Sequence, residues 1–184
     1  MRRPFALAFV GLLTLNSYAF AEDSNQKEIR ANIAKGGWNV YYGEKITEAE
    51  YVGISAATAV AVATENPAPV LKYLEDYVNR TVKKLKSKAP EMTETALRQL
   101  VEKAITAKKG ESRVGKVDVK FGIATYKRWQ RVVYDEPRTR QVKKEKKVLG
   151  KRIVWHEPEV YMERVEKITK LPNWHDPYIA IRVR

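Results

Sequence analysis

Cysteine is absent from this chain of 184 residues. No disulfide can therefore form, and no thiol is present to act as a nucleophile, a metal ligand or a point of lipid attachment. Histidine is scarce too, with two residues in the whole sequence. Without disulfides the chain must fold through burial of apolar side chains, and its length predicts about one domain.

The motifs of several enzyme classes are also missing. The sequence contains no G-x-S-x-G elbow, no P-loop, no glycine pattern of a dinucleotide fold and no H-E-x-x-H zinc motif. An enzymatic function would have to depend on the two histidines. We therefore expect a non-enzymatic protein without a cofactor.

No apolar run reaches the ~20 residues that a membrane-spanning helix needs. The run at residues 5–15 follows two arginines and precedes an A-x-A sequence at residues 19–21. This order of features is typical of a secretory signal peptide. We predict a signal peptide at residues 1–21, a mature chain that starts at Glu22 with no transmembrane span, and a periplasmic or extracellular location.

Acidic residues are in short supply only in the second half of the mature chain. Residues 22–112 contain 14 Lys and Arg against 13 Asp and Glu, whereas residues 113–184 contain 19 against 9. This asymmetry favours contact between the second half and an anionic partner. For an exported protein we expect an anionic envelope component, such as lipid head groups or lipopolysaccharide, or an acidic protein, and no sequence-specific nucleic acid.

Helical patterns dominate the first half. A short helix is predicted at residues 24–35, followed by a short strand at residues 38–42. Apolar residues at three- and four-residue steps predict two longer helices at residues 67–85 and 92–105. Together with a helix that starts near residue 47, these two make three consecutive helices with short connections.

A capping box predicts the start of the remaining helix. Thr47 is followed three residues later by Glu50, so each side chain can bond to the backbone N–H of the other. Residues 51–64 carry no charge and are mostly Ala, Val and Ile. Because a helix that is apolar all round must be covered, we expect this one at the centre of the core.

From residue 114 onward the apolar residues alternate, as in half-buried strands. We expect strand structure up to residue 134, a break at Asp135-Glu136-Pro137, and four further strands at residues 140–149, 151–156, 159–168 and 178–183. Strands after helices predict an α+β fold. In it a layer of about three N-terminal helices packs on one face of a largely antiparallel C-terminal sheet, in one domain spanning residues 22–184.

The most basic segment, residues 138–152, contains eight cations and the single acid Glu145, and it follows an aromatic stretch. One interpretation is an edge hairpin or loop that uses lysine to prevent strand-to-strand aggregation. The other is a polyanion-binding surface that combines cations with stacking rings. Its candidate residues are Arg128, Trp129, Arg131, Tyr134, Arg138, Arg140, Lys143, Lys144, Lys146, Lys147, Lys151 and Arg152.

The sequence Trp-His-acid-Pro occurs twice, at residues 155–158 and 174–177. Each proline should mark the entry to a strand. If the two strands were neighbours, a metal site or general base could be formed by His156, Glu157, His175 and Asp176. We favour the simpler reading, in which the tryptophans pack and the histidines lie in partly exposed turns.

These patterns favour an exported binding protein with a basic, aromatic-rich surface. Two alternatives remain open. One is a membrane-active factor that inserts a helical hairpin made of residues 46–64 and 67–85. The other is a metal hydrolase that depends on the two histidines.

Overall fold

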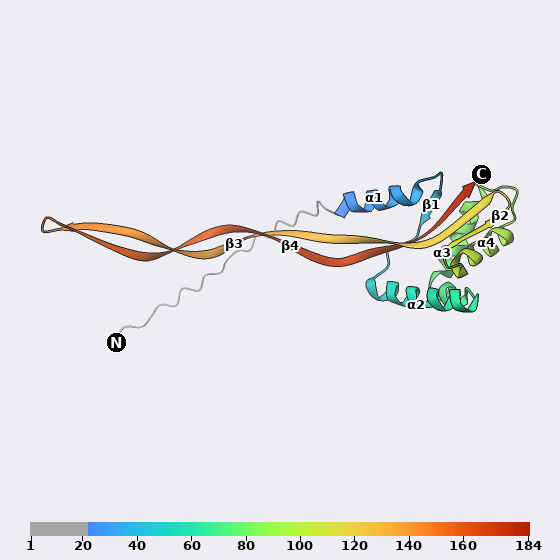
Figure 1. Ribbon diagram of the computed structural model, residues 1–184, viewed down its shortest axis with the longest axis horizontal. Helices are drawn as coiled ribbons and strands as arrows, with labels where there is room; N and C mark the ends of the chain where they lie inside the picture. The colour runs from blue at the N-terminus through green and yellow to red at the C-terminus, as the bar shows by residue number, and fades with distance from the viewer. Residues whose placement is uncertain (1–21) are drawn as a thin grey trace. The chain divides into compact units, whose positions relative to one another are not determined.

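The computed structural model describes residues 22–184, so the predicted signal peptide at residues 1–21 lies outside the described residues. The fold is α+β, as predicted (Figure 1). Its elements, in chain order, are α1 (Glu22–Ala34), β1 (Asn39–Tyr42), α2 (Glu48–Thr64), α3 (Ala68–Lys86), α4 (Glu94–Thr106), β2 (Glu111–Val114), β3 (Val117–Val148) and β4 (Lys151–Val183). The strands form one antiparallel sheet in the order β1-β4-β3-β2.

The described residues fall into two compact units. Residues 22–128 and 171–184 form the helical unit, which contains the four helices, β1, β2 and the adjoining parts of β3 and β4. Trp129–Lys170 make up the rest of β3 and β4, and we call this unit the ribbon. The single domain expected for residues 22–184 stays a prediction.

The helical unit has apolar clusters on both faces of its sheet. On one face, Val119 of β3 and Ile179 of β4 are fully buried against α3 and α4. On the other face, Tyr126 and Tyr178 are covered by α1, whose Ile29 packs against them. Apolar clusters form on both faces because residues 178–181 are apolar on both sides of the strand, and the single layer of about three helices stays a prediction.

Helix α2 begins as predicted but does not lie at the centre of the core. Glu50 N–H donates to Thr47 Oγ1 at 3.3 Å and Thr47 N–H donates to Glu50 Oε2 at 2.7 Å, which is a complete capping box. Only Ile54 and Ala61 are buried, because α2 packs along one narrow stripe. After the first turn, which carries Glu48 and Glu50, the exposed side of the helix is uncharged and contains Val52, Ala56, Ala59, Val60 and Ala63.

Strands β3 and β4 are 32 and 33 residues long, so the five predicted strands are two. The breaks expected at Pro137 and at the two Trp-His-acid-Pro sequences do not occur. In a two-stranded ribbon each strand has one unpaired edge, where a residue without an N–H costs no ladder hydrogen bond. Proline is therefore a poor marker of strand ends in this part of the chain.

Strand β1 adds to the sheet beside the end of β4, with Val40 opposite Ala180. The chain then leaves the sheet at Gly43, whose N–H donates to the Pro177 oxygen at 2.7 Å. A Cβ atom at Gly43 would lie 2.8 Å from the Pro177 ring and 3.2 Å from the Tyr77 ring. Glycine is required here by this close approach.

None of the helices in residues 22–184 is both long and apolar enough to cross a bilayer.

Candidate functional site

The ribbon closes in a two-residue turn formed by Leu149 and Gly150. Both have positive φ, 48° and 80°, as a type I′ turn requires. A two-residue turn places Val148 directly opposite Lys151 and fixes which residues of β3 and β4 face each other along the ribbon. The two strands twist about each other beyond this turn (Figure 1).

This register brings glutamates of β4 opposite cations of β3. Arg140 Nη2 lies 2.8 Å from Glu159 Oε2, and Arg138 Nε lies 3.1 Å from Glu163 Oε2. The remaining ion pairs of the ribbon are Arg131 with Glu166, Lys144 with Glu157, Arg152 with Glu145, and a second contact of Arg138 with Glu136. Five of the predicted binding cations are therefore already paired within the ribbon.

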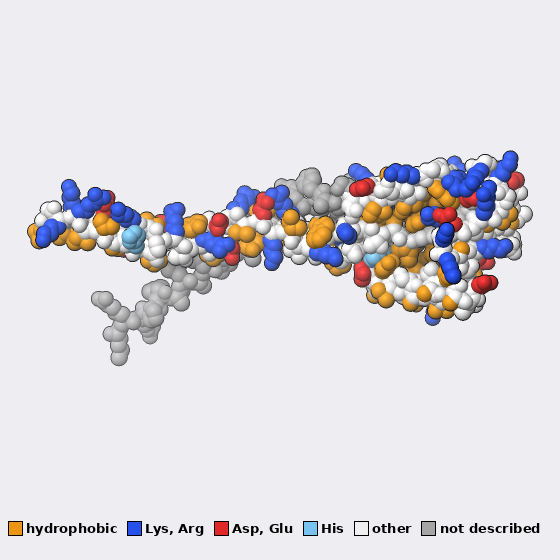
Figure 2. Space-filling model, in the orientation of Figure 1, with side chains coloured by type: hydrophobic (Ala, Val, Ile, Leu, Met, Phe, Trp, Pro, Cys, Tyr) orange, Lys and Arg blue, Asp and Glu red, His pale blue; other side chains and the backbone are white. Residues whose placement is uncertain are grey.

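Four predicted cations have no such partner. Among residues 22–184, no hydrogen bond or ion pair is made by the side chains of Lys143, Lys146, Lys147 and Lys151. They surround the turn, and because neighbouring residues of a strand point to opposite sides, they lie on both faces of the ribbon. We call residues 143–152 the ribbon tip, and Figure 2 shows blue basic side chains gathered there among orange apolar ones.

The tip is also apolar at its apex, which the sequence reading missed. Leu149 is 99% exposed, and Val148, Ile153 and Val154 beside it are exposed as well. A signal was present in the sequence, because a Leu-Gly pair stands where a type I′ turn favours Asn-Gly or Asp-Gly. On the side of the tip, a hollow of about 330 Å³ is lined by Glu145, Lys146, Lys147 and Arg152.

The predicted stacking residues lie in different surroundings. Trp129 is 40% exposed on the ribbon, and Tyr134 is half-buried. Arg128 belongs to the helical unit, where its guanidinium lies 3.8 Å from the centre of the Trp174 ring. Lys45 lies over the same ring at 3.2 Å, so this tryptophan is already used inside the helical unit.

The two Trp-His-acid-Pro sequences lie in separate units, both inside β4 rather than in turns. In the ribbon, His156 is exposed, while Glu157 pairs with Lys144 and accepts a hydrogen bond from Trp155 Nε1 at 2.8 Å. Lys144 and then Trp155 hold the pKa of Glu157 below its ordinary value. Through the pair of Glu157 with Lys144, this copy links β4 to β3 within the ribbon.

The second copy is buried in the helical unit. His175 is 1% exposed, with Nδ1 2.9 Å from Thr125 Oγ1 and Nε2 2.9 Å from Glu48 Oε2. Since a carboxylate only accepts, the Nε2–H donates to Glu48, and in the neutral ring Nδ1 then accepts from the Thr125 hydroxyl. Hydroxyl, imidazole and carboxylate also form nucleophilic triads. Here, however, the ring is stacked on Tyr51 at 3.9 Å between centroids and ties β4 to the first turn of α2.

Asp176 is fully buried and has a different role from His175. Its Oδ2 accepts a hydrogen bond from Arg30 of α1 at 2.7 Å, and the same guanidinium lies 4.3 Å from the centre of the Tyr42 ring. Burial, and then the neighbouring Tyr126, raises the pKa of Tyr42 to about 12, although Arg30 acts in the opposite direction. The hydrogen bond between Arg30 and Asp176 attaches α1 to the sheet.

The four metal-site candidates are therefore not brought together. Within residues 22–184, no group of three or more His, Cys, Asp or Glu side chains is placed to hold a metal ion. The candidates instead have separate partners, with Glu157 bound to Lys144, Asp176 to Arg30 and His175 to Thr125 and Glu48.

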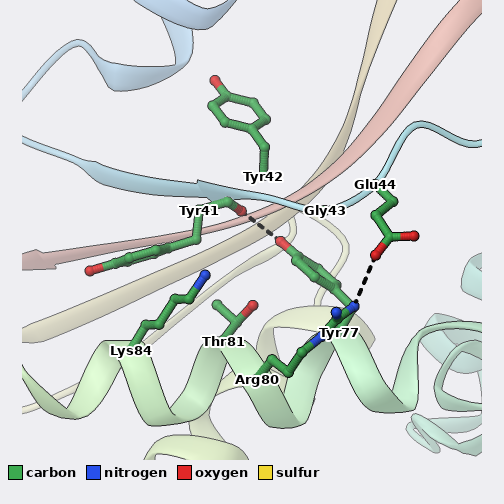
Figure 3. Close-up of a pocket in the computed structure, with 8 residues that line it drawn as sticks. All are labelled: Tyr41, Tyr42, Gly43, Glu44, Tyr77, Arg80, Thr81 and Lys84. Carbon is green, nitrogen blue, oxygen red and sulfur yellow. Dashed lines mark hydrogen bonds and ion pairs between the residues drawn. The ribbon is translucent and has the colours of Figure 1, made fainter.

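A small pocket of about 190 Å³ lies between β1 and α3 (Figure 3). Tyr77 points from α3 to the backbone of β1 and donates to the Tyr41 oxygen at 2.6 Å. Burial raises the pKa of Tyr77, so the hydroxyl remains a donor. Of the two cations that line the pocket, Arg80 already pairs with Glu44 at 3.5 Å, which leaves Lys84. The pocket has less unpaired charge than the ribbon tip.

No family model, curated protein or solved structure matches this chain. Evidence for function therefore comes from the residues of the chain itself.

Proposed function

We propose that this protein is an exported, non-enzymatic binding protein that contacts a polyanionic surface through its ribbon tip. The observation that supports this most strongly is the set of four lysines around the turn that have no acidic partner within residues 22–184. The tip holds six cations and one acid, Glu145. Such a concentration of uncompensated positive charge attracts phosphate-rich surfaces.

The charge of the tip has a simple origin in the sequence of β4. Between the turn and Glu157, residues 151–156 contain no acid. Farther from the turn, Glu157, Glu159 and Glu163 face the cations of β3 and compensate them. The ribbon is thus compensated along most of its length and strongly basic at one end.

The shape of the tip favours a surface over a small ligand. The tip consists of two strands and a turn whose side chains are exposed on both faces. The hollow on its side is open and lined by charged side chains, without the apolar walls of an enclosed ligand pocket. The β3 part of the ribbon, residues 129–148, spans about 65 Å at the usual rise of ~3.3 Å per residue. A long ribbon of this kind can contact a surface without enclosing any part of it.

The test is binding to immobilised heparin and to anionic vesicles as the salt concentration is raised. Changing Lys143, Lys146, Lys147 and Lys151 together to Gln should lower the affinity at low salt by roughly tenfold or more and flatten its salt dependence. The control removes the same charge from exposed lysines of the helical unit that have no ion pair, namely Lys72, Lys83, Lys103 and Lys108. Equal losses in both variants would mean that net charge alone, and not the tip, causes binding.

One observation favours a membrane-active factor as the second candidate. The outer face of α2 is apolar, with Val52 59% and Val60 50% exposed. Against insertion of an α2–α3 hairpin, the apolar face of α3 is already buried in the core, including Val70, Val78 and Leu85. An inserting hairpin would release dye from anionic vesicles, whereas a protein that binds through its ribbon tip leaves them sealed.

A further inference from the structure

We infer that the polyanionic surface is a bilayer of anionic phospholipid, into which the ribbon tip inserts Leu149 while the lysines around it contact head-group phosphates. This inference rests on the proposed function, because it names the partner of the same tip. It differs from charge attraction alone in requiring an apolar contact.

Leu149 is the residue that points to a bilayer. Its backbone is left-handed, with a φ of 48°, a conformation that Asn and Gly adopt readily and that a bulky residue adopts at a cost. Its side chain is 99% exposed, so no packing within the described part of the chain offsets this cost. A leucine at the apex of a turn therefore has no structural reason to be there, and contact with something apolar outside the chain supplies one.

The neighbours of Leu149 extend the apolar apex. Val148 precedes it, and Ile153 and Val154, both about half exposed, are the third and fourth residues after the turn. Lys147 and Lys151 lie on either strand beside Val148 and the turn, and Ile153 and Val154 lie farther from the turn than Lys151. Long lysine side chains can hold their charge at the phosphate level while their methylene groups lie along apolar surface.

A bilayer matches both parts of this arrangement. Its surface carries phosphate groups, and the hydrocarbon begins just beneath them. Soluble polyanions such as heparin or nucleic acid would bind the lysines but would leave Leu149 exposed to water. The order of the residues, with apolar side chains at the apex and cations behind it, follows the order of layers that a protein meets as it approaches an anionic membrane.

The absence of cysteine makes a direct test possible in the full chain. Leu149→Cys is labelled with a polarity-sensitive dye, and Ile168→Cys, an apolar residue of β4 that is 70% exposed on the same ribbon, is the matched control. With vesicles of phosphatidylglycerol and phosphatidylcholine, emission at the Leu149 site should shift to the blue and be quenched by spin labels on the acyl chains. The Ile168 site should show neither change. A dye at Leu149 that stays in water while the protein binds the vesicles would overturn insertion.

The second test separates the apolar contact from the charge. Leu149→Asn replaces the side chain with one that suits the turn, so the ribbon should fold at least as well. Vesicle affinity should fall roughly tenfold or more, because one large apolar side chain is lost from the contact. Heparin affinity should not change, and Leu149→Met should retain vesicle binding. Ile168→Asn is the control for a polar change elsewhere on the ribbon and should have no effect on either.

The outcomes distinguish the two proposals. If the protein binds heparin through the tip lysines but does not bind vesicles, or binds them equally well after Leu149→Asn, the lipid inference is wrong and the proposed function stands. If removal of the tip lysines changes neither heparin nor vesicle binding, the proposed function itself is wrong.

Discussion

The same two strands are built in two different ways in the two units. In the helical unit, Val119 and Ile179 are fully buried between the sheet and its helices. In the ribbon, Val160 and Ile168 of β4 are 67% and 70% exposed. A strand sequence therefore does not determine burial by itself. Burial depends on whether another element covers the strand. The ribbon has no such cover, so its fold depends on backbone hydrogen bonds and cross-strand side-chain pairs.

Charged side chains differ between the two units in the same way. In the helical unit, the buried carboxylates Asp118 and Asp176 are held by arginines, which makes them part of the fold. In the ribbon, ion pairs such as Arg140 with Glu159 are about half exposed on both sides. Exposed pairs contribute little to stability. The ion pairs of the ribbon should therefore contribute less to stability than the buried pairs of the helical unit do.

The largest expected effect compares two isoleucines of β4. Ile179→Ala removes a fully buried side chain from the core and should lower the free energy of unfolding by about 2–5 kcal/mol. Ile168→Ala removes an exposed side chain and should change it by less than about 0.5 kcal/mol. Urea unfolding followed by helical circular dichroism measures both. Similar losses in the two variants would show that the ribbon contributes to the core as strongly as the helical unit does.

A smaller effect is expected at Asp118, where three arginines meet one buried carboxylate. Arg182 Nη2 and Arg184 Nε donate to Asp118 Oδ2 at 2.9 and 2.7 Å, and Arg113 lies 3.4 Å from Oδ1. Burial alone would raise the pKa of Asp118, but the two hydrogen bonds and the nearby positive charges outweigh it and hold the pKa below its ordinary value. The ionised form is thus favoured in the folded state.

The sign of the pH dependence follows from this shift. A carboxylate with a lowered pKa stabilises the fold fully above its unfolded pKa, about 4, and this stabilisation is lost as the pH falls through the folded value. Asp118→Asn should therefore cost about 1–3 kcal/mol at pH 7. The difference between the variant and the parent should shrink as the pH falls below ~4. Urea unfolding at pH 7 and at pH 3 measures this, and an equal difference at both pH values would contradict it.

Local patterns predicted the helices well because the causes of a helix lie within a few residues. The capping box at Thr47 and Glu50 begins α2 as expected. The apolar repeat predicted at residues 67–85 corresponds to α3, Ala68–Lys86, and the one at residues 92–105 to α4, Glu94–Thr106. The position of α2 at the edge of the core was not predicted, because residues 51–64 are uncharged and mostly small, so they give no sign of which side of the helix is covered.

The strands and the candidate site depend on contacts between residues far apart in the chain. The tip lysines were predicted as binding residues from the sequence. Their lack of acidic partners could not be predicted, and neither could the pairing of Arg138 and Arg140 with glutamates of β4. That distinction follows from the register set by the turn at Leu149 and Gly150. The strands predicted at residues 140–149 and 151–156 do leave a turn between them, but the break expected at Pro137 concealed the length of the ribbon.

The smallest expected effect tests whether the ion pairs of the ribbon restrict its charge. Glu159→Gln frees Arg140, whose guanidinium contacts Glu159 through both Nε and Nη2. Stability should change by less than about 0.5 kcal/mol, because the pair is about half exposed. Affinity for anionic vesicles should rise by at most about fivefold, since one more cation becomes available.

Glu44→Gln in the helical unit is the control for this last prediction. It also frees an arginine, Arg80, whose Nη2 lies 3.5 Å from Glu44 Oε1, and it changes the net charge by the same amount. If both variants strengthen vesicle binding equally, the membrane responds to the total charge of the protein. A rise confined to Glu159→Gln places the contact on the ribbon, where β4 limits how many cations of β3 are free to bind.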